Sequence, residues 1–366
     1  MKQTEFARHT VAMFPEVKLP KTNEELMTEY GLDKLAVLNC NENPLGTAPM
    51  AVEAIRQELD RINRYPESGS TELRRAIAAH YGLEADQVIL SNGGDNIITT
   101  LMAAFINAED EIIVGDPSFF VYGVESAILG GKLVKVPLKD FVYDLSGILA
   151  AITPKTKMII ICNPNNPTAT ILRQQEMDAF LAQVPENVLV VMDEAYAEFV
   201  GDAAYPNSVA YIKAGKPVLM IRTFSKLYGL AGLRIGYALS TKPLIATMRK
   251  AIETFPVNRL AQAGAKAALQ DRSFVQQVVA HTDESRAYLT EELQKLGLDV
   301  VPGAANFMFV NLKRESGPVV AALEQKGILI KGGASWGYPT YARISFGTKA
   351  ENQWLIKELK AILAEK

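Results

Sequence analysis

The chain has 366 residues, of which 48% are hydrophobic and 22% charged, and its formal net charge is −3. This length predicts two domains, or one large domain with a smaller one attached, and the apolar content is sufficient for a buried core. Basic residues are neither in excess nor in long runs, which argues against a nucleic-acid-binding or membrane-binding surface.

The small number of cysteines and the absence of long apolar runs favour a cytoplasmic protein. The two cysteines, Cys40 and Cys162, cannot form a disulfide framework, and neither has a second Cys or His at the spacing of a metal site. The opening residues lack the long apolar stretch of a secretory signal, and no apolar run reaches the roughly 20 residues that span a bilayer. We therefore expect reduced thiols, no metal and a cytoplasmic location.

Short apolar runs alternate with helical patterns along the first two thirds of the chain, after a Pro-punctuated segment that we interpret as an arm. Helical patterns cover Thr71–Tyr81 and Asn96–Phe105. The apolar runs are rich in Val and Ile, as in strands buried on both faces: Val88–Leu90, Glu111–Val114, Lys132–Val136, Met158–Ile161, Val188–Met192 and Val218–Ile221. Strands interleaved with helices predict a mostly parallel α/β sheet.

The pattern changes after Thr241. Helical patterns dominate from Lys242 to Leu296, and a final helix begins at Ala350. Between them, short strands are expected at Phe307–Asn311, Ile328–Lys331 and Ala342–Ser345. This arrangement predicts a smaller α+β domain. We therefore expect an N-terminal arm over residues 1–45, a large domain over 46–255 and a small domain over 256–366.

Polar and small residues follow the ends of the predicted strands, where ligands bind in an open α/β sheet. The small-residue turn Ser91–Asn96 leads into a helix and suits an anion. Phe119, Asn166 and Asp193 each come soon after a different strand. The last run leads into hydroxyls, a lysine and an arginine: Thr223, Ser225, Lys226 and Arg234. Each fragment alone also has a purely structural explanation, such as a turn, a core aromatic or a capping carboxylate.

Taken together, these fragments indicate a binding site. They offer an anion cradle, a ring for stacking, a side-chain amide, a carboxylate, a phenol and a lysine with a neighbouring arginine. Such a set suits a cofactor that has a phosphate, an aromatic ring, a pyridine nitrogen, a phenolic oxygen and an aldehyde.

Several motifs, spread over nearly the whole chain, resemble those of the fold-type I aminotransferases of classes I and II, and among these the histidinol-phosphate aminotransferases most. They are Leu38–Gly46, Arg64–Glu67, Asn163–Thr168, Asp193–Tyr196, and Thr223–Lys226 with Gly232–Gly236. The resemblance implies a large domain with a seven-stranded, mostly parallel sheet and a small α+β domain that the arm completes. It also implies pyridoxal 5′-phosphate as cofactor and ping-pong transamination between an amino donor and a 2-oxo acid.

The resemblance implies a role for each matching residue. Lys226 is similar to the lysine that bonds to the cofactor and moves a proton, and Asp193 to the partner of the pyridine nitrogen. Tyr196 and Asn166 match the residues that hold the phenolic oxygen, and Phe119 matches the ring-stacking position. The phosphate is expected to contact Gly94, Asp95, Thr223, Ser225, Arg234 and, from a neighbouring subunit, Tyr65. That last contact implies a homodimer with shared sites.

On the substrate side the resemblance implies contacts from Asn43, Lys331 and Arg343. The chain departs from the family pattern at Ala169 and Asn96, where Gly and Glu are usual, and at Lys331, where histidinol-phosphate enzymes usually have arginine. Histidinol phosphate with 2-oxoglutarate is the expected substrate pair. Transamination of aromatic amino acids and decarboxylation of threonine phosphate use nearly the same residues and remain open, as does a regulatory protein that binds the cofactor without catalysis.

Overall fold

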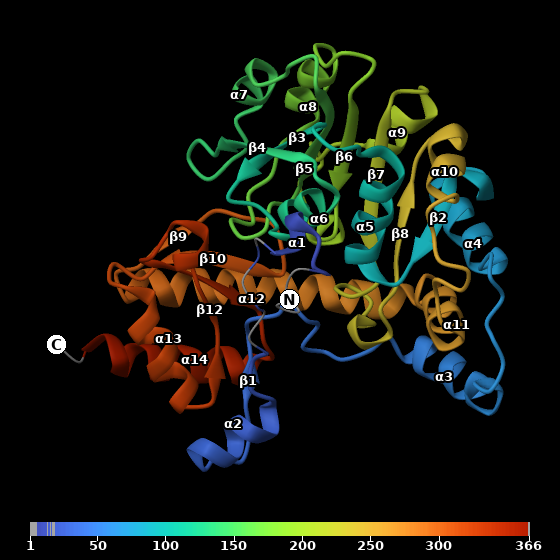
Figure 1. Ribbon diagram of the computed structural model, residues 1–366. Coiled ribbons are helices and arrows are strands. Elements are labelled where there is room, and N and C mark those ends of the chain that lie inside the picture. The colour runs from blue at the N-terminus through green and yellow to red at the C-terminus, as the bar shows by residue number, and fades with distance from the viewer. Residues whose placement is uncertain (1–5, 13, 15, 17–18, 365–366) are drawn as a thin grey trace.

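A computed structural model describes residues 6–12, 14, 16 and 19–364 (Figure 1). Its α-helices are α1 (His9–Ala12), α2 (Asn23–Tyr30), α3 (Pro49–Glu58), α4 (Thr71–Tyr81), α5 (Gly93–Phe105), α6 (Val121–Leu129), α7 (Leu145–Ala150), α8 (Gln174–Leu181), α9 (Ser208–Lys213), α10 (Lys242–Met248), α11 (Arg259–Ala268), α12 (Arg272–Lys295), α13 (Ser316–Gln325) and α14 (Lys349–Ala364). Its strands are β1 (Ala36–Val37), β2 (Val88–Ser91), β3 (Glu111–Asp116), β4 (Lys132–Pro137), β5 (Thr156–Cys162), β6 (Leu189–Asp193), β7 (Val218–Thr223), β8 (Gly236–Leu239), β9 (Asp299–Val301), β10 (Phe307–Asn311), β11 (Ile328–Leu329), β12 (Lys331–Gly332) and β13 (Tyr341–Ser345).

The predicted α/β sheet is confirmed. Its seven strands lie in the order β2-β8-β7-β6-β5-β3-β4. Neighbouring strands are parallel except at β8, which is antiparallel to both β7 and β2. Six of these strands overlap the predicted apolar runs. The seventh, β8, was not predicted, because its short sequence Gly-Tyr-Ala-Leu carries neither an alternating pattern nor a run of branched residues.

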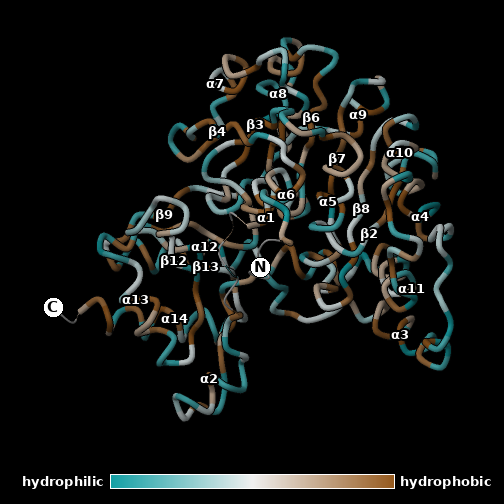
Figure 2. The backbone as a smooth tube through the Cα atoms, viewed as in Figure 1, coloured by the Kyte–Doolittle hydropathy of each residue, from teal (hydrophilic) through white to brown (hydrophobic). Residues whose placement is uncertain are grey.

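The core of the large domain surrounds the middle strands of this sheet. Ile159, Ile160 and Ile161 of β5 are fully buried, as are Val191 and Met192 of β6. Figure 2 shows hydrophobic segments along β6 and β7. Strands covered by helices on both faces have no polar face, which explains their continuous apolar sequences.

The small domain contains the antiparallel sheet β12-β13-β10-β9 and the parallel pair β1-β11. Through that pair, the N-terminal arm contributes to the small domain, because Ala36 pairs with Ile328 and Leu38 is buried in the same core. The arm also contains a helix that was not predicted. Helix α2 begins with a capping box, in which Thr22 accepts from the backbone of Glu25 and the Glu25 side chain accepts from Thr22.

The long helix α12 runs between the two parts of the molecule (Figure 1). Its buried residue Phe274 belongs to the core cluster that also contains Leu90 of β2, whereas Leu289 belongs to the small-domain cluster. Helix α11 packs against α3 and shares the first of these clusters. We therefore propose that the division between the domains lies within α12, later in the chain than the expected boundary at residues 255 and 256. Among the described helices, none is both long and apolar enough to cross a membrane.

Candidate active site

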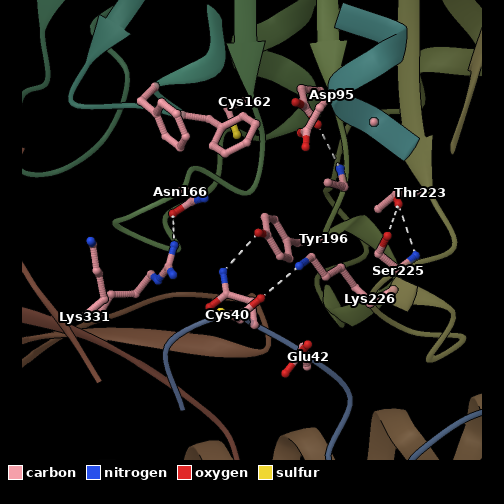
Figure 3. Close-up of a pocket in the computed structure, with 18 of the residues that line it drawn as sticks. Cys40, Glu42, Asp95, Cys162, Asn166, Tyr196, Thr223, Ser225, Lys226 and Lys331 are labelled. Carbon is pink, nitrogen blue, oxygen red and sulfur yellow. Dashed lines mark hydrogen bonds between the residues drawn. The ribbon is translucent and has the colours of Figure 1, made fainter. Parts of the chain in front are cut away.

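A cavity of about 870 Å³ lies between the carboxyl ends of the large-sheet strands and the small domain (Figure 3). Its lining brings together residues that the sequence analysis took from separate motifs: Gly94, Asp95, Phe119, Asn166, Asp193, Tyr196, Thr223, Ser225, Lys226, Arg234, Lys331 and Arg343. Asn43 and Tyr65 are not in the lining. The parallel strands account for this convergence, because their carboxyl ends meet at one edge of the sheet.

Lys226 follows the end of β7 and points into the cavity. Its Nζ donates to the backbone carbonyl of Cys40 at 3.1 Å. Burial, and then the nearby positive charge of Arg343, lower the pKa of Lys226 to about 8. A larger fraction of neutral amine is therefore present near neutral pH, as a nucleophilic lysine requires.

Asp193 is the last residue of β6 and is buried. Tyr122 donates its hydroxyl to Oδ2 at 2.5 Å, and the backbone N–H of Ala195 donates to Oδ1 at 3.2 Å. Burial raises the pKa of Asp193, while these hydrogen bonds oppose the rise. No Lys, Arg or His of the described residues forms an ion pair with Asp193, so a ligand with a cationic group would supply the missing charge.

The start of helix α5 and the loop after β7 form an anion-binding end of the cavity. Asn92, the N-cap residue of α5, makes no side-chain cap, so the first N–H groups of the helix are available to an anion. The hydroxyls of Thr223 and Ser225 lie 2.9 Å apart. Gly236 allows β8 to approach, because a Cβ there would lie 2.7 Å from the backbone nitrogen of Gly94.

Arginines occupy both the anion-binding end and the small-domain side of the cavity. Arg234 pairs with Asp95 at 3.3 Å near the start of α5. On the other side, Arg343 of β13 is buried and donates to Asn166 Oδ1 at 2.7 Å and to the carbonyl of Asn39 at 2.5 Å. The Nε of Arg343 is buried without a hydrogen-bond partner. Its N–H is therefore available to donate to a ligand.

Tyr196 completes the wall between these ends. Its hydroxyl accepts from Asn41 Nδ2 at 3.0 Å, and burial raises its pKa to about 12, so the phenol is a neutral hydrogen-bond donor at physiological pH. Lys331 lies at the opposite side of the view from Thr223 and Ser225 (Figure 3).

Sequence reasoning missed several contacts at the site. Tyr122, the partner of Asp193, was not predicted as a site residue, although it lies three residues after Phe119, whose ring it contacts. Asn41 lies in the Leu38–Gly46 motif, which could have suggested it. Trp336 lines the cavity next to Arg343, with 5.4 Å between the guanidinium carbon and the ring centroid, and no sequence signal marked it.

Two predicted site residues have contacts outside the cavity. Asn43 donates its amide to the carbonyl of Leu227 at 2.8 Å, beside the lysine rather than in the cavity. Tyr65 is 78% exposed and stacks on Phe255 with 4.5 Å between ring centroids. Of the departures from the family pattern, Ala169 adopts a positive φ of 62°, a conformation that favours the usual glycine. Asn96 accepts a hydrogen bond from Ser91.

Comparison with known proteins identifies the class to which this fold and cavity belong. The profile of the family described as "Aminotransferase class I and II" matches residues 33–359. The chain belongs to this family.

Within this family, the chain is similar to several histidinol-phosphate aminotransferases. The chain is 44% identical over 345 residues to a histidinol-phosphate aminotransferase from Moorella thermoacetica, covering 94% of this chain and 89% of that protein. It is 39% identical to a histidinol-phosphate aminotransferase from Halalkalibacterium halodurans, covering 96% and 95% of the two chains. The crystal structure of a histidinol-phosphate aminotransferase from Sinorhizobium meliloti in complex with pyridoxal-5′-phosphate superposes with a TM-score of 0.90 at 29% identity, covering 98% of this chain and 97% of the other.

The protein is a pyridoxal-phosphate-dependent aminotransferase, and its own residues fit the cofactor. Asp193 is a buried carboxylate without a described cationic partner, as a protonated pyridine nitrogen requires. The uncapped start of α5 and the paired hydroxyls of Thr223 and Ser225 suit a phosphate. Lys226, with its lowered pKa, suits the aldehyde.

Proposed function

We propose that the protein transfers an amino group between histidinol phosphate and 2-oxoglutarate by a ping-pong mechanism. The observation that carries the proposal is the pair of cations, Lys331 and Arg343, on the small-domain side of the cavity. The substrate names of the relatives from Moorella thermoacetica and Halalkalibacterium halodurans support the same choice.

At the cofactor end, each residue acts on a defined part of the reaction. Bound pyridoxal phosphate supplies an electron sink for the carbon that loses its proton. Asp193 would hold the pyridine nitrogen in its protonated form, and Tyr196 and Asn166 would hold the phenolic oxygen. The backbone of Gly94 and Asp95, with Thr223, Ser225 and Arg234, would bind the phosphate. Lys226 would bond to the cofactor through its amine, and that amine would move the proton at the reacting carbon.

At the substrate end, the two cations suit two different anions. Arg343 presents a planar fork that binds a carboxylate bidentately, as glutamate requires when it returns the amino group. An incoming carboxylate would take hydrogen bonds that Arg343 now makes to Asn166 and to the carbonyl of Asn39. Lys331 is an exposed point charge, which suits a phosphate group.

A substrate panel tests the assignment. Purified enzyme with cofactor is mixed with histidinol phosphate, tyrosine, phenylalanine or threonine phosphate, and the cofactor absorbance and the products are followed. We expect histidinol phosphate to change the absorbance and to form a keto product with 2-oxoglutarate as acceptor. Rapid turnover of aromatic amino acids without turnover of histidinol phosphate would favour the aromatic aminotransferase, and release of carbon dioxide the decarboxylase.

We also propose a homodimer in which Tyr65 contacts the phosphate in the other subunit. Tyr65 is highly exposed, and exposed apolar side chains lie near it in sequence at Leu59 and Ile62 and in space at Phe255. Exposed apolar groups of this kind favour a protein interface. Tyr65→Phe protein should need more cofactor to saturate. At limiting cofactor, mixing it with Lys226→Ala protein should raise activity through hybrid dimers that have one site free of both lesions. No recovery after verified subunit exchange would contradict the shared site.

The proposed function includes a cytoplasmic location.

A further inference from the structure

Two charged residues in or directly next to the site motifs do not line the cavity. Glu194 follows Asp193, and Arg222 precedes Thr223, yet neither of these charged side chains is in the cavity lining. Successive side chains of a strand point to opposite faces of a sheet. Asp193 and Thr223 therefore face the cavity, while Glu194 and Arg222 face the other side.

On that other side, Arg222 binds two carboxylates. Its Nε and Nη2 donate to Glu194 Oε2 at 3.0 and 2.7 Å, and its Nη1 pairs with Glu198 Oε1 at 3.0 Å. The side chains of Arg222, Glu194 and Glu198 are only 13%, 1% and 15% exposed. Ser208 donates a further hydrogen bond to Glu194. We call Arg222, Glu194 and Glu198 the arginine cluster.

The arginine cluster spans the turn that carries two site residues. Glu194 and Glu198 lie two residues before and two residues after Tyr196, and Asp193 immediately precedes Glu194. The backbone N–H of Glu194 donates to the carbonyl of Ile221 at 3.0 Å. That bond joins the ends of β6 and β7. Beyond it the two segments separate, one into the turn after β6 and the other into the loop that carries Lys226. The guanidinium of Arg222 joins β7 to both ends of the turn.

We propose that the arginine cluster positions Asp193 and Tyr196 relative to Lys226. The three groups must meet one rigid cofactor, but they come from two separate strand ends, so their spacing depends on what joins those ends. The fork of Arg222 fixes direction as well as distance, which a single point charge does not. Arg222, Glu194 and Glu198 are positioning residues because none of them lines the cavity. The inference rests on the proposed roles of Asp193 and Lys226 and does not depend on which amino donor is used.

The test is the Arg222→Lys variant, which keeps the positive charge but removes the planar guanidinium. Two readouts distinguish positioning from simple stabilisation: the affinity of cofactor-free protein for pyridoxal phosphate, and the pH at which the absorbance of the Lys226–cofactor linkage changes. Both are measured well below the unfolding temperature. Displacement of the groups that contact the cofactor should weaken its binding by about tenfold or more and shift the absorbance transition.

A matched control makes the same chemical change elsewhere. Arg249 donates to the carbonyls of Asp86 and Val88, at the edge of the large sheet opposite the cavity. Arg249→Lys should leave cofactor affinity and the absorbance transition as in the unchanged protein, even if it lowers the unfolding temperature. Glu198→Gln, which keeps the Arg222–Glu194 contact, should fold and should change both readouts in the same direction as Arg222→Lys, by a smaller factor.

The outcomes are decisive for the arginine cluster. If Arg222→Lys folds with lower stability but unchanged affinity and unchanged absorbance transition, the cluster is structural only and the proposal is wrong. If Arg222→Lys does not fold, Glu198→Gln decides on the same two readouts. Borohydride reduction and peptide mapping of the unchanged protein separate the two proposals, since cofactor trapped on a lysine other than Lys226 would overturn the proposed function itself.

Discussion

The cavity has a cofactor end, built by the large sheet, and a substrate end, built by the small domain. At the cofactor end, Asp193, Thr223 and Ser225 are buried, and each has a side-chain hydrogen bond to another residue of the large domain. At the substrate end, Lys331 is exposed, and Arg343 forms its hydrogen bonds with the carbonyl of Asn39 and the side chain of Asn166. The cofactor end is therefore arranged before any ligand binds, whereas the substrate end exchanges its own contacts for those of a ligand.

The largest expected effect is at the cofactor end, in Lys226→Ala. This change should abolish turnover, because it removes the amine that bonds to the cofactor and moves the proton. Steady-state rates and borohydride trapping, followed by peptide mapping, measure the effect. Lys331→Ala is the matched control: it removes a lysine from the same cavity but should still trap the cofactor on Lys226.

Asp193→Asn should reduce kcat by about 100-fold or more, equivalent to about 2.7 kcal/mol, while cofactor still binds. An amide cannot hold the pyridine proton as a carboxylate does. Tyr122→Phe is the control, since it removes the 2.5 Å hydrogen bond to Asp193 but keeps the carboxylate, and it should cost about tenfold at most. Equal losses in the two variants would contradict the assigned role of the carboxylate.

At the substrate end, Lys331→Ala should raise the KM for histidinol phosphate by about fivefold, a modest effect because an exposed charge is screened by solvent. The KM for an aromatic amino acid should stay the same. Lys326→Ala removes another exposed lysine, at the end of α13, and should change neither value. An equal rise for both substrates would show that Lys331 does not recognise phosphate.

The smallest expected effect links the two ends through the pKa of Lys226. Arg343→Gln should raise this pKa above about 8, because the positive charge of Arg343 contributes to lowering it. The folded protein binds fewer protons at Lys226 than the unfolded chain between that value and the ordinary 10.5, so stability of the cofactor-free protein rises with pH across this window. In Arg343→Gln the rise should begin at higher pH, as urea unfolding at several pH values would reveal. An unchanged pH dependence would contradict the coupling.

The same contrast explains what could be predicted from the sequence. Strands β2, β3, β5, β6 and β7 were predicted because burial on both faces imposes continuous apolar runs, and the cofactor end was predicted because its residues follow those runs directly. Contacts between distant segments left no local pattern. The hydroxyl of Tyr122 reaches Asp193 across 71 positions, and Asn41 reaches Tyr196 across 155. The pairing of Arg222 with Glu194 and Glu198 likewise left no local pattern, although Glu194 lies in the Asp193–Tyr196 motif.

The pairing of β1 with β11 has a consequence for the order in which the protein is made. Ala36 leaves the ribosome long before its partner Ile328, which lies far downstream in the same chain. Domains generally fold as the nascent chain emerges, so the large sheet can form while the segment with Asn39 and Asn41 still lacks its partner strand. Until β11 and the strands that follow it have emerged, a nascent molecule would carry a cofactor end with no substrate end, and premature termination before β11 would leave it in that state.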